Sequence, residues 1–493
     1  MFSWLKLNWT PLDFILLVIF FVLLFLTEYR PIRLKVKKRK KLAGDGRLTV
    51  NDIPGPKPSL PVLGTRWIFS GFGPYKMNKI HEAYKDMFQK YGKVVKEESL
   101  WNFPVISVVD LKSIEEVLNQ HSKYPLRPPT EVTVHYRKSR PDRYSNLGLV
   151  NEQGETWHHL RGVLTPELTS PKTRNEVHSF EEFANRMGLE VTCKLILGRR
   201  MGFLNDKVDP LALRLATAVR THFCASRDTF YGLPFWTMFP TKTYKNFADS
   251  EETIYEIISD LVEKSLEEEN QTCKTSEVQG VFSSILTAKG LSTKDKKAAI
   301  IDFIAAGIQT LGNTLVFLLY LIAKHKDVQE KLHKEISEII PRGSAITAES
   351  LKRATYLRAC ITEAFRILPT APWVARILEK EMNLSGYHLK PGIVVICHTW
   401  LACLQDSNFE SASEFRPERW LVEGAKPSSF LVVPFGSGRR MCPGKRFSEQ
   451  ELQVVLAKVV SEFILEFDGD LQLQFEFLLS PQAPVKLRLI DRE

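Results

Sequence analysis

The chain has 493 residues, which is more than one hydrophobic core usually supports, so we expect several core regions. Hydrophobic residues make up 44% and charged residues 25%, the balance of a packed globular protein, which excludes a disordered or collagen-like chain. The seven cysteines are too few and too scattered for a disulfide framework. They favour a reducing compartment, in which one or more free thiols take part in the chemistry of the protein.

The net charge of +10 is concentrated at the start of the chain, where the first 50 residues contain ten basic and three acidic residues. A basic run, Arg33–Lys41, closely follows the apolar stretch Phe14–Leu26. A membrane-spanning helix needs about 20 residues, so the stretch spans only if Trp9–Tyr29 takes part. Basic residues beside an apolar helix prefer anionic lipid headgroups, and no small-residue cleavage site follows. We therefore predict an uncleaved anchor over residues 1–29 with membrane lipid as its partner, in preference to a cleaved signal peptide or a nucleic-acid-binding tail.

A proline-rich segment follows the basic run and includes Pro54, Pro56, Pro58 and Pro61. Proline removes a backbone donor and restricts φ, so this segment is neither a helix nor an inner strand. We predict a basic linker and stiff elbow over residues 30–64, and a folded body over residues 65–493.

The body has a mainly helical pattern with a few short β-rich runs, which predicts an α+β fold with small sheets at its edges. Amphipathic helical runs are Thr173–Gly188, Ser250–Glu269 and Ser448–Phe463. The β-rich runs are Val94–Asp110, Val374–Leu389, Ile393–Ile396 and Leu471–Ile490.

The longest helix is predicted from Ser292 to about His325, with Ser292 and Asp295 as a capping box. Glycine at position 307, in its centre, costs about 1 kcal/mol relative to alanine, so the missing side chain should serve a purpose. Two reasons for the glycine remain possible at this point. A planar group could lie against the helix, or a second helix could pack tightly on it. Thr310 can donate to a carbonyl one turn earlier.

The loop from Phe435 to Gly444 is rich in glycine and contains Cys442 immediately before a helical run that starts at Lys445. Glycines let the backbone wrap closely around a thiolate, and a following helix N-terminus stabilises its negative charge, so the loop suits a metal-binding sulfur. Zinc is disfavoured because no second Cys or His lies at ligand spacing, and the loop lacks the features of a phosphate-binding loop. A buried structural cysteine remains the alternative.

The loop resembles, position for position, the haem-binding loop of the cytochrome P450 family. Further motifs of that family occur in the expected order, and the resemblance spans about residues 50–493. The matching positions are Phe435, Gly438, Arg440, Cys442 and Gly444 in the loop, Trp157–Arg161, Ala306–Thr310, Glu363–Arg366 and Phe415–Trp420.

The resemblance implies a haem-thiolate monooxygenase that carries haem b and inserts one atom of O₂ into a C–H bond. Two electrons come from NADPH through a redox partner, and the second oxygen atom leaves as water. Cys442 would be the iron ligand, the metal-binding position of the chain. The other cofactor-binding positions implied are Phe435, Gly438, Arg440, Trp157, Arg161 and Arg376, of which the arginines and Trp157 would face the haem propionates.

The resemblance also implies catalytic positions at Gly307, Gln309 and Thr310 in the central helix. Thr310 would position water and protons. Position 309 usually carries an acid in this family, and an amide cannot titrate. Proton delivery would therefore rely on water, on Thr310 or on another acid. The motif further implies a network of Glu363, Arg366 and Arg419, which must be fully hydrogen-bonded if it is buried.

Longer stretches, among them Tyr124–Glu131, Ser139–Tyr144 and Phe239–Tyr244, are similar to arthropod members of the family that hydroxylate the steroid ecdysone at carbon 20. They imply ecdysone as substrate, with another steroid or sterol as the alternative. Segments expected to line its pocket are Val132–Leu149, Phe303–Thr310, Thr370–Val374 and Phe477–Leu479. A haem-binding sensor and a catalytically silent steroid-binding protein are rivals from other classes.

The redox partner has two candidates. Mitochondrial relatives use a small acidic, adrenodoxin-like ferredoxin, which Arg358, Lys445 and Arg446 would attract, although Thr362 stands where a second lysine is common. The anchor and elbow instead resemble the microsomal type, which uses NADPH–P450 reductase in the endoplasmic reticulum. We expect a membrane-associated enzyme and favour the mitochondrial inner membrane with a ferredoxin.

Overall fold

The computed structural model describes residues 48–492 except 121, 165–179, 198–200, 206–209, 272–289, 342 and 423–426. The predicted anchor and the basic run lie outside the described residues.

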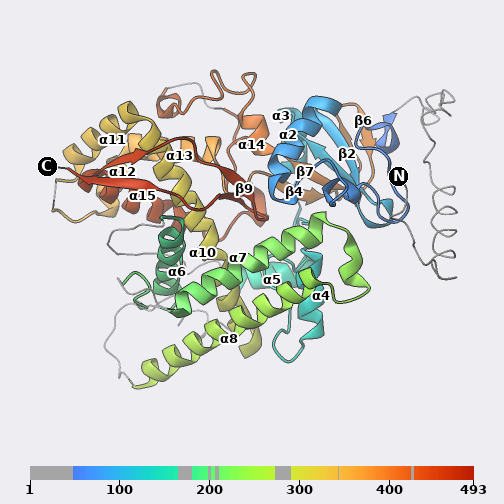
Figure 1. The fold of residues 1–493 in the computed structure, drawn as a ribbon, viewed down its shortest axis with the longest axis horizontal. Helices are drawn as coiled ribbons and strands as arrows, with labels where there is room; N and C mark the ends of the chain where they lie inside the picture. Colours follow the sequence, from blue (N-terminus) through green and yellow to red (C-terminus); the bar gives the residue numbers. More distant parts are fainter. Residues whose placement is uncertain are drawn as a thin grey trace, which may run out of the picture.

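Helices make up most of the body, and short strands form small sheets, so the predicted α+β class is confirmed (Figure 1). The helices are α2 (Ile80–Tyr91), α3 (Leu111–Leu118), α4 (Glu131–Ser139), α5 (Gly154–Leu164), α6 (Phe180–Leu197), α7 (Pro210–Tyr231), α8 (Lys242–Gln271), α10 (Thr293–Lys324), α11 (Lys326–Ile339), α12 (Ala348–Arg353), α13 (Thr355–Ile367), α14 (Thr399–Cys403) and α15 (Lys445–Glu462). The strands are β1 (Leu48–Thr49), β2 (Val94–Glu98), β3 (Pro104–Val108), β4 (Val374–Ile377), β5 (Met382–Leu384), β6 (Tyr387–Leu389), β7 (Val394–Cys397), β8 (Phe463–Phe467), β9 (Leu473–Phe475), β10 (Leu479–Pro481) and β11 (Leu487–Asp491).

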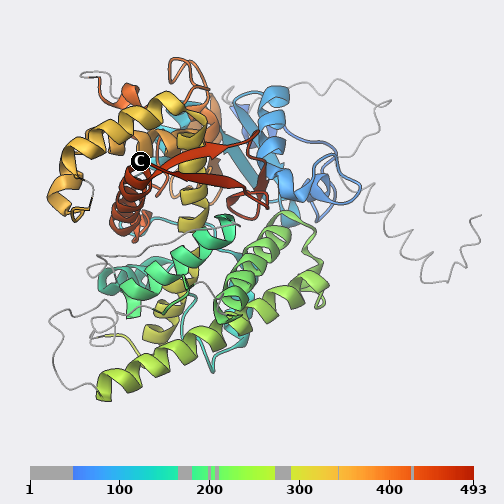
Figure 2. The same ribbon diagram turned by 60° about the vertical axis from the view of Figure 1, so that its left-hand side comes forward.

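The largest sheet has the order β2-β3-β7-β4 and joins strands from two distant parts of the chain. Its β3 and β7 are parallel, with Ile106 opposite Val395, whereas the outer pairs are antiparallel. Helices α2 and α3 lie beside this sheet at one end of the molecule (Figure 1). In the helical part, α7 and α8 run side by side in both views (Figure 2). This arrangement leaves β4, which carries Arg376, at an edge of the sheet.

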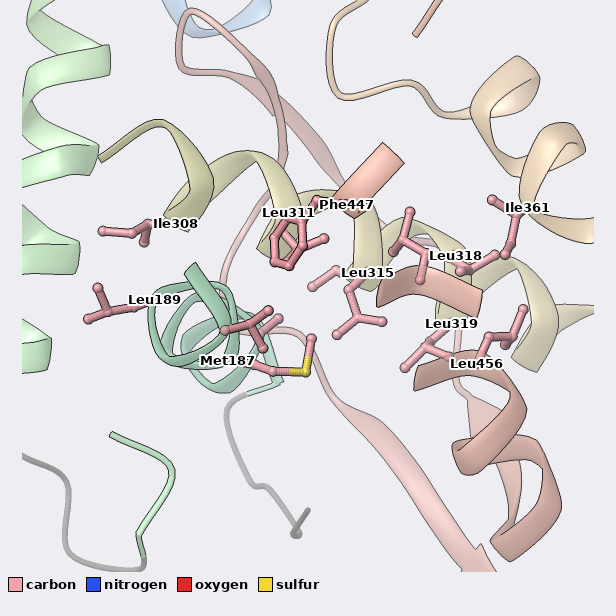
Figure 3. Packing of buried hydrophobic residues seen from close by; sticks show 14 of the residues in the cluster. Met187, Leu189, Ile308, Leu311, Leu315, Leu318, Leu319, Ile361, Phe447 and Leu456 are labelled. Carbon is pink, nitrogen blue, oxygen red and sulfur yellow. The ribbon is translucent and has the colours of Figure 1, made fainter. Parts of the chain in front are cut away.

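Helix α10 is the centre of the main core. It begins after Ser292, and the predicted capping box is present, with the Ser292 hydroxyl accepting from Asp295 N and the Asp295 carboxylate accepting from Ser292 N. Leu311, Leu315 and Leu319 of α10 pack with side chains from α6, α13 and α15 (Figure 3). By length and composition α10 could cross a membrane, but 67% of its most apolar window is buried inside the protein, as expected of a core helix.

The glycine in the middle of α10 faces α6. A Cβ atom at position 307 would lie 2.2 Å from Thr192 Oγ1, and one at Gly188 of α6 would lie 2.7 Å from the carbonyl oxygen of Ile308. Two glycines thus let the helix backbones approach closely. Of the two explanations open from the sequence, tight helix packing accounts for Gly307. A role for Gly307 at the haem remains a prediction.

We expect Gly307→Ala to lower the free energy of unfolding by about 1–3 kcal/mol, because the added methyl group overlaps Thr192. Adding Thr192→Ala should restore most of this loss, since it removes the two nearest atoms, one of them a buried hydroxyl oxygen without a hydrogen-bond partner in the part of the chain that the structure describes. Chemical denaturation of the wild type, both single variants and the double variant tests this. Equal loss in Gly307→Ala with and without the second change would contradict the proposed contact.

Residues 48–64, which the sequence interpretation assigned to the linker, pack on the body. Strand β1 pairs with β6, and Ile53 is buried in the core beside the largest sheet. The amide of Lys96 in β2 donates to Pro54 O at 2.8 Å. The folded body therefore includes this segment. The described part of the proline-rich elbow contains no helix between Ile53 and Thr65, as predicted.

Candidate active site

The cysteine loop is held in a tight backbone conformation. The amide of Cys442 donates to Phe435 O at 2.7 Å, which closes the loop. Gly436 and Gly438 have φ values of +76° and +64°, a region that side-chain-bearing residues rarely adopt. The Phe435 ring contacts the Phe365 ring edge to face at 5.3 Å, which fixes the loop on α13. Phe435 and Gly438 thus shape the loop, and their predicted contact with the cofactor remains a prediction.

The thiol of Cys442 lies in front of α15, which begins at Lys445. Its side chain is accessible to solvent, although protein atoms surround it closely enough that burial raises its pKa. The backbone of Gly444 and the charges of Arg161 and Arg127 act in the opposite direction and favour the thiolate. A bound cation would stabilise the thiolate further.

Four arginines gather near this thiol, and the sequence predicted three of them. Arg161 lies on α5, Arg376 on β4 and Arg440 in the 3₁₀ turn Gly438–Arg440. The fourth, Arg127, precedes α4. Arg440 donates to Pro125 O at 2.8 Å and its guanidinium lies 3.8 Å from the centre of the Trp157 ring.

Burial lowers the pKa values of all four arginines, and repulsion by neighbouring arginines lowers those of Arg376 and Arg440 further. Burial, followed by the charges of Arg127, Arg376 and Arg161, lowers the pKa of Arg440 to about 9. Burial and the charge of Arg127 lower the pKa of Arg376 to about 10. Such a gathering of cations calls for an anionic group of matching charge, and the two carboxylates of a haem fit this requirement. The donor set and the cysteine loop therefore fit a haem.

Arg127→Met should weaken haem retention by roughly tenfold or more, because hydrogen bonds to charged groups contribute about 1.5–3 kcal/mol. Transfer of haem to an excess of apomyoglobin measures this loss directly. The matched control is Arg353→Met, which removes an exposed arginine of α12. If both variants release haem at the wild-type rate, Arg127 has no place at the cofactor.

The two polar residues predicted in the central helix point to different partners. Thr310 Oγ1 donates to Ala306 O at 2.7 Å, which confirms the predicted bond to the preceding turn. Gln309 is 4% exposed, and its Nε2 donates to Glu476 Oε2 at 2.7 Å. The structure therefore places an acid beside position 309, and this acid comes from the C-terminal hairpin.

Three of the four segments predicted to line the pocket meet at Thr310 and its neighbours. Thr314 Oγ1 donates to Thr310 O at 2.8 Å and lies 2.8 Å from Thr370 Oγ1. The amide of Leu479 in turn donates to Thr370 O at 2.9 Å. The fourth segment contacts α10 about two turns earlier, where Arg137 Nη1 donates to Asp302 Oδ2 at 3.1 Å.

The predicted network of Glu363, Arg366 and Arg419 is confirmed. Glu363 and Arg366 are both 0% exposed, and the carboxylate accepts from Arg366 Nη2 at 2.7 Å and from Arg419 Nε at 2.9 Å. Trp420 Nε1 donates to Glu363 Oε2 at 2.9 Å, a contact that the sequence interpretation did not include. The network ties α13 to the segment that leads to the cysteine loop.

Sequence reasoning missed Arg127 and Glu476 as members of the site. Neither residue belongs to a short motif. Each reaches the site through a loop or a hairpin turn, and the spacing of nearby residues does not predict where such a segment lies in the fold. A signal was present only for the second, because the amide at position 309 left another acid open as one of three possible routes for protons. Among the described residues, three or more His, Cys, Asp or Glu side chains nowhere gather as they would around a zinc ion.

Comparison with known proteins agrees with this geometry. The cytochrome P450 family model matches residues 54–188 and 172–489. The chain therefore belongs to the cytochrome P450 family. As a member it is a haem-thiolate monooxygenase that uses O₂ and electrons from NADPH, delivered by a redox partner.

Individual relatives cover most of the chain. The ecdysone 20-monooxygenase of Drosophila melanogaster is 45% identical and covers 90% of this chain and 88% of its own length. The mitochondrial cytochrome P450 302a1 of the same organism is 29% identical over 89% of this chain and 94% of its own length. The mitochondrial 1,25-dihydroxyvitamin D(3) 24-hydroxylase of Mus musculus is 25% identical, with 84% of each chain covered.

Proposed function

We propose that this enzyme hydroxylates ecdysone at carbon 20. The observation that carries the proposal is the 45% identity to the ecdysone 20-monooxygenase over nine tenths of the chain, combined with a complete cysteine and arginine site. Hydroxylation of another steroid or sterol is the second candidate, supported by the similarity to a vitamin D hydroxylase.

Cys442 is proposed as the iron ligand. Arg127, Arg161, Arg376 and Arg440 would bind the haem carboxylates, with the Trp157 ring stacked on the Arg440 guanidinium. The haem, when bound, supplies the oxidising chemistry of the reaction. Phe435 and Gly438 act by holding the loop in which the sulfur is presented.

The chain's own residues orient the substrate and position the protons that the reaction consumes. One turnover consumes a C–H bond, one O₂, two electrons and two protons, and yields one hydroxyl group and one water. Thr310 is proposed to position protons on the substrate side of α10, with its hydroxyl held one turn back on Ala306 O.

The redox partner is proposed to be a ferredoxin of the mitochondrial type, and the compartment to be the mitochondrial inner membrane. A surface groove of about 500 Å³ on the cysteine side is lined by Arg358, Thr362, Phe435 and Lys445. Arg446 beside it is exposed, so basic side chains are available to an acidic protein there. Arg358 is only partly available to a partner protein, because it also donates a hydrogen bond to Leu351 O at 2.7 Å. The alternative is the reductase of the endoplasmic reticulum.

The test is turnover with each electron donor. The full chain is expressed in membranes, supplied with ecdysone and NADPH, and combined with either a ferredoxin and its reductase or NADPH–P450 reductase. We expect 20-hydroxyecdysone, identified by mass spectrometry, with the ferredoxin system. Absence of any hydroxylated product with both donors would overturn the substrate assignment. A change in the haem spectrum on adding ecdysone without any product would instead identify a silent steroid-binding protein.

A further inference from the structure

Strand β2 carries a buried acid that lacks a full set of partners. Glu97 is 8% exposed. Burial raises the pKa of Glu97 to about 7, although the Tyr84 hydroxyl of α2 donates a hydrogen bond to its carboxylate. One carboxylate oxygen, Oε2, is buried and accepts no hydrogen bond from the residues that the structure describes. A buried acceptor without a donor is costly, so we expect this atom to meet a group from outside the chain.

A buried cation lies in the same surroundings. Arg66, in the 3₁₀ turn Arg66–Phe69, is 9% exposed. Burial lowers the pKa of its guanidinium, whereas the charges of Glu131 and Glu97 act in the opposite direction. Within the described part of the chain no ion pair joins Arg66 to either acid, and its one hydrogen bond runs from Nη1 to Gly232 O at 3.4 Å. A guanidinium has five N–H donors, so most of those of Arg66 remain available to a ligand.

Glu97 faces an aromatic cluster that includes residues from the predicted substrate pocket. Side chains alternate between the two faces of a strand, so Glu97 shares a face with Val95. Val95 packs in a core cluster whose aromatic members are Phe69, Tyr84, Tyr231 and Phe475. Helix α2 lies against β2 at this cluster (Figure 1). Trp373 and Phe477, both partly buried, pack against the same cluster and belong to two of the segments expected to line the pocket.

A chain of hydrogen bonds joins Glu97 to the predicted pocket segment 370–374. The Tyr231 hydroxyl of α7 is hydrogen-bonded to both the Tyr84 hydroxyl and the Trp373 side chain. An indole only donates and a carboxylate only accepts, so the donors run from Trp373 through the two tyrosines to Glu97. The rings of Tyr84 and Trp373 also meet edge to face, with their centres 5.4 Å apart. Every hydrogen of this chain is used, so Oε2 of Glu97 needs a donor from elsewhere.

The segment that contains Trp373 runs from the central helix to this cluster. At its start, Thr370 Oγ1 lies 2.8 Å from Thr314 Oγ1 of α10. Trp373 follows three residues later, and three residues span at most about 10 Å, which is similar to the length of a steroid ring system. A substrate whose reacting carbon lies near Thr310 would therefore place the far end of its ring system near Trp373 and the two charged groups.

We propose that Glu97 and Arg66 form a polar subsite for the end of the steroid that lies farthest from the hydroxylated carbon. The inference rests on the proposed function and deepens it. Ecdysone carries two neighbouring hydroxyl groups on its terminal ring. Each hydroxyl group can donate to the Glu97 carboxylate and accept from the Arg66 guanidinium, and hydrogen bonds to charged groups are the stronger ones. The subsite therefore favours a steroid with this pair of hydroxyl groups over a sterol with a single one.

The test compares ecdysone with 2-deoxyecdysone, which lacks one of the two neighbouring hydroxyl groups. The dissociation constant of each steroid is measured on the haem-loaded full chain by equilibrium dialysis and by the change in the haem spectrum. We expect the wild type to bind ecdysone roughly tenfold or more tightly, because a site built to hydrogen-bond a hydroxyl group rejects an analogue without it. Glu97→Gln keeps the shape of the side chain and removes its charge. In this variant the preference for ecdysone should fall below about threefold, mainly through weaker binding of ecdysone.

Further measurements separate ligand binding from a structural role. In turnover with ecdysone, Glu97→Gln should raise KM by a larger factor than it lowers kcat, because the subsite lies away from the reacting carbon and binds substrate and transition state alike. The thermal unfolding midpoint without steroid should stay close to that of the wild type, since the substitution removes a buried charge that the chain does not fully satisfy.

Two other variants complete the set. Arg66→Lys keeps the charge but loses the planar fork of donors, so it should also lose most of the preference for ecdysone. This variant decides the question if Glu97→Gln does not fold. Glu82→Gln is the matched control, because it changes an acid of α2 whose side chain is 61% exposed, and it should keep the wild-type preference.

The possible results are distinct. If both subsite variants keep the wild-type preference, or if the wild type binds the two steroids equally well, Glu97 and Arg66 do not bind the hydroxyl groups. If Glu97→Gln weakens both steroids equally and lowers the unfolding midpoint, the acid has a structural role instead. If the wild type neither binds nor hydroxylates ecdysone with either electron donor, the proposed function itself is wrong, and the subsite falls with it.

Discussion

Replacing Cys442 by alanine should abolish the haem-thiolate spectrum with carbon monoxide and reduce product formation to background. The chain offers no second thiol in the loop, and the nearby arginines can hold the haem carboxylates but cannot ligate the iron. Haem that remains bound should give the spectrum of a protein without a sulfur ligand. Absorption spectra of the reduced, carbon monoxide-treated variant measure this, together with haem content per protein.

The control is Cys360→Ala, which removes a buried thiol of α13 and should keep the thiolate spectrum. Circular dichroism of both variants distinguishes the loss of a ligand from the loss of the fold. If purified, folded Cys442→Ala retained the wild-type carbon monoxide spectrum, the assignment of the iron ligand would be wrong.

Replacing Arg366 by methionine should lower the free energy of unfolding by about 3–5 kcal/mol, because it leaves the buried Glu363 carboxylate short of its main counter-charge. All five N–H groups of the Arg366 guanidinium are used. Two go to Glu363 and three to the carbonyls of Cys403, Ala412 and Glu414. Arg366→Lys cannot reproduce this geometry and should fail similarly. Denaturant unfolding of the expressed protein, or its yield with bound haem, measures the loss.

A pair with the same spacing but opposite burial provides the control. Lys352 and Glu349 are also three residues apart on a helix, with side chains 75% and 76% exposed. Lys352→Met should change stability by less than about 0.5 kcal/mol. Similar losses of unfolding free energy in the two variants would show that burial is not the reason why the Glu363 network stabilises the protein.

Features set by local spacing were predictable from the sequence. The start of α10 followed from Ser292 and Asp295, and the pairing of Glu363 with Arg366 followed from their separation by one helical turn. The end of α15 was predicted less well. The helical pattern was expected to run to Phe463, but the strand β8 starts there. Phe463 pairs with Asp491 of β11, and pairing with a distant strand overrides the local helical preference.

Residues that reach the site across long stretches of chain were not predictable. Glu476 is 167 positions from Gln309, and Arg127 is 313 positions from Arg440. Similarly, residues 48–64 have the composition of a linker, yet pairing of β1 with β6 draws them into the body. None of these contacts leaves a periodic or spacing signal, because they depend on how separate elements pack.

By itself, the sequence determined the family, the mainly helical α+β body, the cysteine loop and the Glu363 network, since each rests on residue types at short, fixed spacings. The tertiary structure alone decided which acid stands beside position 309, which fourth arginine joins the site and what the glycine at 307 accommodates. Those three answers depend on side chains from different elements meeting in space. A protein core fixes such meetings through close packing and through the requirement that buried charges find partners.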